Sequence, residues 1–305
     1  MERGRAAAIS AHGLRARKGV TALLVQGAAL ACLVLSGSVQ AAGSAQMPRA
    51  AGQLYRVGAA QLYVQISGSG APVLFLHGGL SFFDVSFAAQ RDYFGAFRTV
   101  IGIDQRGHGH SPDNGQAFSY RQMAEDTAAV LQQLKLGPVD VVGHSDGGNV
   151  ALLLARLHPE QVRRVVVSGA NTRGDPGGLL AYARFWMETD QHFTQALAPD
   201  LRQAYARVSP DGVDHWPIFA AKTKDLWLTW TVLDADDLAA IRAPVLVMAG
   251  EHDVISLEHT RYIARHLAHG RLCILPGSGH MTMRERPEEF NRVVRAFLDE
   301  APAGP

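Results

Sequence analysis

The chain has 305 residues, of which 47% are hydrophobic and 19% are charged, and its formal net charge at pH 7 is +1. This composition excludes an intrinsically disordered chain and suits one large α/β domain that carries an insertion. A net charge so close to zero leaves no basic surface large enough for nucleic acid, so we expect no nucleic-acid partner.

Residues 1–41 have the layout of a secretory signal peptide. Five basic residues precede an apolar stretch from 20 to about 35, and small residues follow up to Ala41. A basic start, an apolar middle and a small-x-small cleavage site are typical of such leaders. Cleavage would lower the net charge from +1 to −3, because five basic residues and Glu2 leave together. We therefore expect an exported protein, periplasmic or secreted, with no stable membrane anchor.

Other readings of this segment differ in what they predict. An uncleaved anchor would need about 20 apolar residues, and Gln26 and Gly27 interrupt this stretch. Lipid attachment at Cys32 is disfavoured because the apolar run continues past the cysteine. A start at Met47 would make the protein cytoplasmic. After cleavage only Cys273 remains, so no internal disulfide can form, and its strand-like surroundings predict a buried, inert thiol.

Residues 42–52 are a predicted linker, after which short apolar runs alternate with helical patterns. The first two runs predict an antiparallel pair. The later all-apolar runs are typical of a parallel sheet that helices cover on both faces, which indicates a doubly wound, mostly parallel α/β fold. The predicted strands, about eight, are 53–57, 61–67, 72–76, 99–103, 139–142, 165–167, 245–248 and 272–275, and the predicted helices are 120–134, 148–157, 257–267 and 287–298.

The five residues Gly143-His144-Ser145-Asp146-Gly147 stand where a predicted strand ends and a predicted helix begins. A serine at a sharp strand-to-helix turn is held in strained backbone geometry with its hydroxyl exposed. The flanking glycines are needed because side chains there would clash with neighbouring backbone. The segment therefore predicts a nucleophile elbow with Ser145 as the attacking residue.

The interval 171–242 is far longer than an ordinary crossover between strands. We therefore expect a helical cap, residues 171–242, inserted between two parts of an α/β core, residues 53–170 and 243–300. All four tryptophans fall in this interval. Aromatic side chains there can form the core of the cap or line an apolar pocket above the nucleophile, and both roles can hold at once. The candidate pocket residues are Leu80, Phe185, Trp186, Trp216, Trp227 and Trp230.

A serine hydroxyl needs a base within hydrogen-bond reach, and that base needs an orienting carboxylate. Asp253 follows the predicted strand 245–248, and His280 follows the predicted strand 272–275. Both residues thus lie at carboxyl ends of strands, as Ser145 does, and in an open α/β sheet sites form at that edge. We expect His280 to be the base and Asp253 the acid, with Glu251 as the alternative acid.

An acyl-transfer site also requires hydrogen-bond donors for the oxyanion. The backbone N–H of Asp146, at the amino end of the helix after the elbow, is one expected donor. The second is expected in the glycine-rich loop that follows strand 72–76, where Gly79 is preferred and Leu80 is the alternative. His77, in the same loop, is expected to form a supporting hydrogen bond instead of acting as a base.

Taken together, the motifs resemble the α/β-hydrolase superfamily over residues 53–300. Residues 77–79 are similar to the family's oxyanion loop, 104–111 to its Asp-x-Arg-Gly-x-Gly-x-Ser turn and 143–147 to its elbow, and residues 244–253 and 277–280 are similar to the segments that hold the acid and the histidine. The order serine, acid, histidine also matches. The resemblance implies that Asp104 and Arg106 are structural residues of their turn.

The same resemblance implies a serine hydrolase of the capped group, which includes carboxylesterases, lactonases and carbon–carbon bond hydrolases. Epoxide hydrolases and haloalkane dehalogenases carry an aspartate where this chain has Ser145, and Leu80 departs from the proline iminopeptidase loop. The chain has no His-Glu-x-x-His segment and no cysteine pair, so no metal centre and no cofactor are expected. His108 and His110 are expected to belong to their turn.

The Asp146 carboxylate beside the nucleophile would disfavour a negative group close to the scissile bond. The tryptophans favour apolar substrates in the same way. We therefore predict hydrolysis of small to medium neutral esters or lactones. The alternatives are an acyltransferase or a carbon–carbon bond hydrolase on the same triad, and a ligand-binding protein with little turnover, because a fold does not guarantee an activity.

Overall fold

The computed structural model describes residues 51–173, 199–229 and 232–301. The predicted signal peptide lies outside these ranges, and so do the candidate pocket residues Phe185, Trp186 and Trp230. Within the described ranges, no helix is both long enough and apolar enough to span a membrane.

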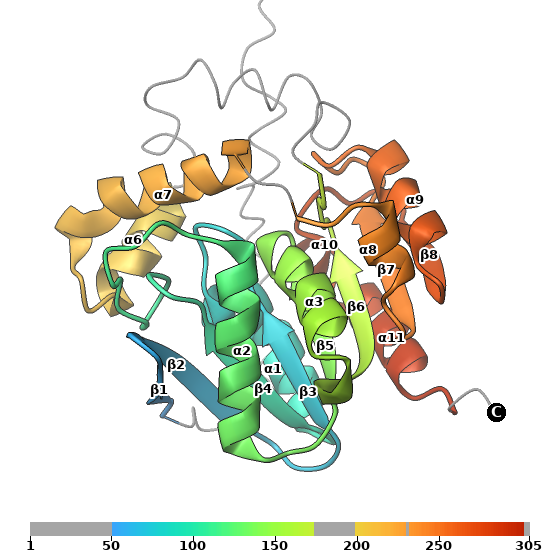
Figure 1. Cartoon of the computed structure of the whole chain (residues 1–305), viewed down its shortest axis with the longest axis horizontal. Helices are drawn as coiled ribbons and strands as arrows, with labels where there is room; N and C mark the ends of the chain where they lie inside the picture. Colours follow the sequence, from blue (N-terminus) through green and yellow to red (C-terminus); the bar gives the residue numbers. More distant parts are fainter. Residues whose placement is uncertain (1–50, 174–198, 230–231, 302–305) are drawn as a thin grey trace, which may run out of the picture.

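Eight strands form one sheet in the order β1-β2-β4-β3-β5-β6-β7-β8 (Figure 1). β2 pairs antiparallel with β1 and with β4, and all other neighbours are parallel. This confirms the predicted mostly parallel sheet. The strands are β1 Gln53–Val57, β2 Ala60–Ser67, β3 Pro72–Leu76, β4 Thr99–Asp104, β5 Val139–His144, β6 Val162–Ser168, β7 Val245–Gly250 and β8 Gly270–Leu275.

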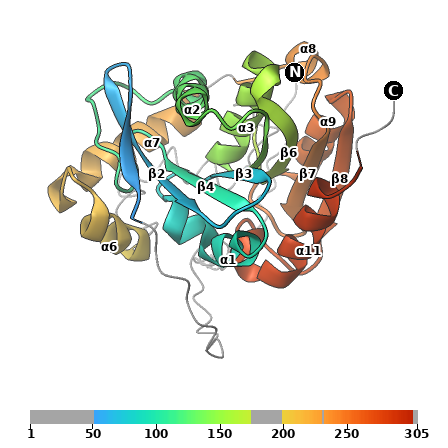
Figure 2. The same ribbon diagram turned by 90° about the horizontal axis from the view of Figure 1, so that it is seen from below.

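Helices cover both faces of the sheet. Helices α2, α3, α8 and α9 lie on one face, and α1 and α11 lie on the other (Figure 2). The short α10 contacts both α1 and α11. Each face encloses its own hydrophobic cluster, so the all-apolar strands are buried from both sides. The helices are α1 Phe83–Gly95, α2 Tyr120–Leu134, α3 Asp146–Leu157, α6 Pro199–Val208, α7 Trp216–Thr229, α8 Ala235–Ala239, α9 Leu257–His266, α10 Thr282–Glu285 and α11 Pro287–Leu298.

The sequence patterns predict no helix over Phe83–Gly95, where the structure has α1. Its buried face includes the polar residues Gln90 and Arg91, and Phe87 interrupts the helix with a φ of −128° and a ψ of 24°. The buried amide of Gln90 donates to the side chain of Asn291 in α11. Because the buried face mixes polar and apolar residues, the helical period is hidden in the sequence.

Two expectations of detail need correction. Helix α3 begins at Asp146, two residues before the predicted start at 148, because Ser145 itself stands at the position that precedes the helix. Cys273 is half-buried and not buried, since β8 is an edge strand of the sheet. Burial still raises the pKa of its thiol.

Between β6 and β7 the structure describes α6, α7 and α8, and α7 lies over the core at the upper left of Figure 1. Tyr205 of α6 stacks on Phe219 of α7 with ring centroids 4.9 Å apart, and Trp216 packs against both rings. Lys222 of α7 donates to the buried carboxylate of Asp113, in the loop after β4, at 2.6 and 2.8 Å. The helix is therefore joined to the core by an ion pair as well as by apolar packing.

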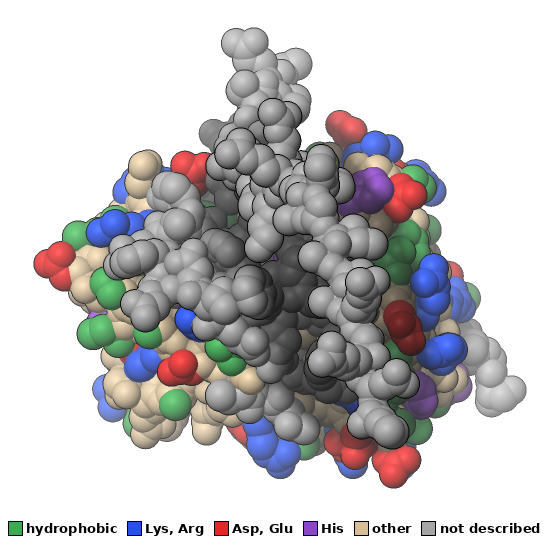
Figure 3. Space-filling model, turned by 90° about the horizontal axis from the view of Figure 1, so that it is seen from above, with side chains coloured by type: hydrophobic (Ala, Val, Ile, Leu, Met, Phe, Trp, Pro, Cys, Tyr) green, Lys and Arg blue, Asp and Glu red, His purple; other side chains and the backbone are tan. Residues whose placement is uncertain are grey.

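Figure 3 views the molecule from the side that is uppermost in Figure 1. On the described surface that faces the viewer, acidic and basic side chains are interspersed along the rim. The described part of this rim therefore carries charges of both signs.

Candidate active site

Ser145 occupies a sharp turn between β5 and α3. Its φ is 52° and its ψ is −117°, a region that residues with a side chain rarely adopt. A Cβ on Gly143 would lie 2.2 Å from the carbonyl oxygen of Gly147, and a Cβ on Gly147 would lie 2.0 Å from that of Leu76. Only glycine fits either position, so the two glycines allow the turn that holds the serine.

His280 and Asp253 meet in loops that follow neighbouring strands. The distance from His280 Nδ1 to Asp253 Oδ1 is 2.7 Å, and Asp253 Oδ1 also accepts the N–H of Ile255 at 2.9 Å. A carboxylate can only accept, so Nδ1 is the protonated nitrogen and Nε2 keeps its lone pair. Burial alone would lower the pKa of His280, but the charge and hydrogen bond of Asp253 outweigh it, and the pKa is raised.

The alternative acid lies elsewhere. Glu251 is exposed, and its Oε2 accepts the N–H of Gly277 at 2.9 Å. The structure thus pairs His280 with Asp253, and Glu251 instead braces the loop in front of His280.

The turn of Ser145 and the loop of His280 are in direct contact. His144, which precedes Ser145, donates from Nε2 to the backbone carbonyl of His280 at 2.9 Å, and the two rings lie 4.7 Å apart. Burial, with a smaller effect of His280, lowers the pKa of His144 to about 3, so this ring stays neutral. A Cβ on Gly169 would lie 2.7 Å from the His280 ring. Sequence reasoning missed both supporting residues, although a glycine directly after a strand is a signal of close approach.

The expected oxyanion donors lie where the strand order reverses. β3 has β4 on one side and β5 on the other, and such a switch point opens a crevice at the carboxyl ends of the two strands. Asp146 is the first residue of α3, so its N–H has no partner within the helix. Gly79 follows β3 in the facing loop. Leu80 has a φ of 55°, and its side chain is buried in the hydrophobic core.

The two described tryptophans of the predicted pocket differ in role. Trp216 is 1% exposed and packs against Tyr205 and Phe219, in a hydrophobic cluster that helices α6 and α7 share with the core of the sheet. Trp227 is half-buried, and its Nε1 donates to both oxygens of the Asp146 carboxylate at 3.0 and 2.9 Å. Tyr120 donates from its hydroxyl to Asp146 Oδ1 at 2.7 Å. The hydrogen bonds of these two side chains therefore fix the position of the Asp146 carboxylate. No sequence pattern predicted this arrangement.

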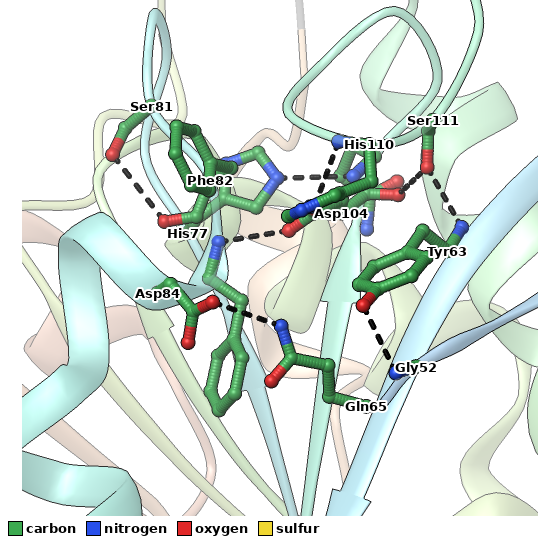
Figure 4. Close-up of polar contacts among 12 residues, drawn as sticks. Gly52, Tyr63, Gln65, His77, Ser81, Phe82, Asp84, Asp104, His110 and Ser111 are labelled. Carbon is green, nitrogen blue, oxygen red and sulfur yellow. Dashed lines mark hydrogen bonds and ion pairs between the residues drawn. The ribbon is translucent and has the colours of Figure 1, made fainter. Parts of the chain in front are cut away.

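Figure 4 shows the turn after β4. Asp104 accepts the N–H of Phe83 at 2.9 Å, and it accepts from the backbone and the ring of His110 at 3.0 and 2.9 Å. His77 Nε2 accepts the N–H of Gln105 at 3.0 Å. These bonds confirm the supporting roles predicted for Asp104 and His77. Burial lowers the pKa of His77, and both its ring nitrogens have partners, so it does not serve as a base.

The remaining residues of that turn are also structural. Arg106 pairs with Asp126 of α2, and His108 donates from Nδ1 to the Arg106 carbonyl at 2.9 Å. Burial lowers the pKa of His108 to about 3, so its ring is neutral. In the described ranges, no group of three or more His, Cys, Asp or Glu residues is placed to hold a metal ion.

Glu285 of α10 braces the loop of the candidate base. Its two carboxylate oxygens accept the N–H groups of Gly279 and Met281, which flank His280, at 2.5 and 3.2 Å. A glutamine has only one acceptor oxygen, so Glu285→Gln leaves one N–H group without its partner. We expect kcat/KM for turnover at this site to fall about fivefold, the equivalent of about 1 kcal/mol for one hydrogen bond. Steady-state assays beside the exposed control Glu288→Gln test this, and equal rates in both variants would argue against a role for Glu285.

A model of the alpha/beta hydrolase family matches residues 73–293. The chain is similar to the human serine hydrolase BPHL, with 27% identity over 262 residues that cover 79% of this chain and 84% of that protein. It is also similar to the 2-hydroxymuconate semialdehyde hydrolase of Pseudomonas putida, with 29% identity over 257 residues that cover 77% and 90% of the two chains.

Among solved structures, one similar chain is Est816, described as an N-acyl homoserine lactone degrading enzyme. Its TM-score is 0.61 and its sequence identity 26%, over 80% of this chain and 100% of that one. The matched region includes the elbow, both loops of the His280 and Asp253 pair, and most of the sheet. The chain belongs to the alpha/beta hydrolase family.

Proposed function

We propose that the protein is a serine hydrolase that cleaves small to medium neutral carboxylic esters or lactones through an acyl-enzyme. The observation that supports this most directly is the hydrogen bond between His280 and Asp253 beside the strained turn of Ser145. A nucleophile, a base and an orienting acid, supplied by three loops at one sheet edge, are the parts that acyl transfer needs.

The proposed reaction uses these three side chains in turn. Ser145 Oγ attacks the ester carbonyl and gives its proton to His280 Nε2, while Asp253 stabilises the imidazolium that forms. The N–H groups of Asp146 and Gly79 bind the oxyanion of the tetrahedral intermediate. His280 then gives the proton to the leaving alcohol, which leaves an acyl group on Ser145. Water repeats the cycle and releases the carboxylic acid.

The relatives support this assignment and also suggest a second one. A lactone-degrading enzyme and a serine hydrolase are among the similar proteins, and both names fit acyl transfer to a serine. The similar hydrolase of a semialdehyde, from Pseudomonas putida, makes cleavage of a carbon–carbon bond the second candidate. Both candidates would use the same three side chains.

A panel of substrates tests the proposal. The purified protein would be assayed with p-nitrophenyl esters of increasing acyl length, with a γ-lactone, and with a vinylogous diketone that reports carbon–carbon cleavage. A fluorophosphonate would be reacted with the protein in parallel, and its position found by mass spectrometry. We expect ester or lactone turnover and a label on Ser145. Turnover of the diketone alone would establish the second candidate, and a folded protein without turnover or label would contradict both.

The charge of the substrate is expected to matter. The Asp146 carboxylate lies next to the nucleophile, and among the described residues no Lys or Arg is paired with it. A carboxylate on the substrate close to the scissile bond would be repelled. We expect kcat/KM to be at least about tenfold higher for a neutral ester than for its acidic isostere, which corresponds to about 1.4 kcal/mol. Comparison of p-nitrophenyl pentanoate with a mono-p-nitrophenyl succinate measures this, and faster turnover of the succinate would contradict it.

A further inference from the structure

Three separate segments meet at the Asp146 carboxylate. Tyr120 is the first residue of α2, Asp146 is the first residue of α3, and Trp227 lies near the end of α7. The phenol and the indole both donate to this one carboxylate, at distances from 2.7 to 3.0 Å. The carboxylate thus links the cap to the residue that follows the nucleophile.

The loop of Gly79 is packed against the same group. A Cβ on Gly79 would lie 2.5 Å from Asp146 Oδ2 and 2.6 Å from Cζ2 of the Trp227 ring. The backbone of Gly79 therefore packs closely against the two side chains at the point where their hydrogen bond forms. Since Asp146 and Gly79 are also the two expected oxyanion donors, a shift of the Trp227 ring would change the space between them.

The chemistry of the contact favours a role in positioning. Asp146 is 8% exposed, and burial raises the pKa of its carboxyl group. Both of its hydrogen-bond donors are neutral side chains. They fix the orientation of the carboxylate but supply no positive charge to balance its own charge. A buried carboxylate is costly unless its hydrogen bonds are well formed. Such a network holds its members in one arrangement as long as all its bonds are made.

We propose that Asp146 is a positioning residue whose carboxylate, bound by Trp227 of the cap and Tyr120 of α2, sets the separation of the oxyanion donors at Asp146 and Gly79. The proposal rests on the proposed function, because these N–H groups have a catalytic role only if an oxyanion forms in the reaction. Its consequence is that cap helix α7 takes part in the chemical step as well as in substrate binding.

Helix α7 offers a matched control. A second polar contact between this helix and the core is the ion pair between Lys222 and Asp113, which Nε2 of His215 joins at 2.8 Å. Lys222 lies more than one helical turn before Trp227, and its ammonium group contacts Asp113 and the ring of Phe118, whereas the described donors to Asp146 are Tyr120 and Trp227. Lys222→Gln therefore loosens the same helix without changing the Asp146 carboxylate.

The experiment compares Asp146→Asn, Trp227→Phe, the double variant and Lys222→Gln with p-nitrophenyl acetate, whose acyl group is too short to sample a deep pocket. Active sites are titrated with a fluorophosphonate so that kcat refers to folded enzyme. We expect each single variant at Asp146 or Trp227 to lower kcat about tenfold at nearly constant KM, because displaced donors lose transition-state contacts. The kcat of the double variant should match that of the less active single variant within about threefold, because both changes act on the same contact between Asp146 and Trp227. Lys222→Gln should leave kcat within about twofold of wild type.

Several outcomes would overturn the proposal. An unchanged kcat in Asp146→Asn, with only lower stability towards urea, would leave the network a structural contact. An equal loss of kcat in Lys222→Gln would assign the effect to general loosening of the cap. Losses that multiply in the double variant would show that the two residues act independently.

Failure of the proposed function would be seen separately. If wild type turns over no ester but its Ser145 still reacts with the fluorophosphonate, the rate of that reaction replaces kcat as the measure, because it uses the same donors. Equal rates in wild type and Asp146→Asn would then overturn the positioning role, and a slower variant would support it. If Ser145 in folded wild type does not react at all, both proposals fall.

Discussion

Replacement of Ser145 by alanine is expected to lower kcat for ester hydrolysis by about 10⁴-fold or more, because the attacking oxygen is lost while the oxyanion donors remain. The protein should stay folded, since the hydroxyl is not part of the packing that shapes the turn. Steady-state assays with the ester panel, and circular dichroism of the same samples, measure both effects. Retained activity in the folded variant would mean that another group is the nucleophile.

The same position is expected to separate activity from stability. Ser145 has a φ of 52° and a ψ of −117°, which glycine adopts without strain and alanine does not. Ser145→Gly should therefore be inactive yet more stable than Ser145→Ala, by about 1 kcal/mol in the free energy of unfolding. Urea titrations of the two variants test this difference. A glycine variant that is less stable than the alanine variant would show that the turn carries no such strain.

Asp253→Asn is expected to lower kcat by about 10³-fold to 10⁴-fold, because the amide no longer fixes the proton of His280 on Nδ1. The residual activity should also change its dependence on pH. The charge of Asp253 raises the pKa of His280, and the base works only when it is neutral. Activity thus rises as pH increases through this pKa. Loss of the charge lowers the pKa, so the acid limb of the kcat/KM profile should move to lower pH.

Glu251 supplies the control for Asp253. It lies two residues earlier, carries the same charge and bonds to Gly277 instead of His280. Glu251→Gln should keep kcat within about threefold of wild type and leave the acid limb in place. If Glu251→Gln abolishes activity and Asp253→Asn does not, the roles assigned to the two carboxylates are reversed.

The sheet and the elbow could be predicted from the sequence because both rest on local patterns. All-apolar runs mark strands that are buried on two faces, and the glycines at 143 and 147 are required by contacts with backbone alone. Helix α1 escaped prediction because its buried face includes Gln90, whose partner Asn291 lies 201 residues away in the chain. A pattern within one segment of the sequence cannot indicate a partner so far away in the chain.

The roles of the cap tryptophans show the same limit. Trp216 and Trp227 are 11 residues apart in α7, which places them on nearly the same side of the helix but about 16 Å apart along its axis. One meets Tyr205 and Phe219, and the other meets the Asp146 carboxylate. Spacing in the sequence gives the direction in which a side chain points from its helix. The roles of these two tryptophans depend instead on which residues lie opposite each end of α7.

The aromatic cluster of the cap also has a consequence for thermal behaviour. Phe219 of α7 packs edge-on against the ring of His108, 4.7 Å away, and lies near Phe118. One continuous hydrophobic cluster therefore includes side chains of the cap and side chains on the face of the sheet that α2 and α3 cover. Separation of α7 from the core would expose apolar surface on both. The two parts should therefore melt in one cooperative transition, and heat should inactivate the enzyme only at the temperature where the whole fold is lost.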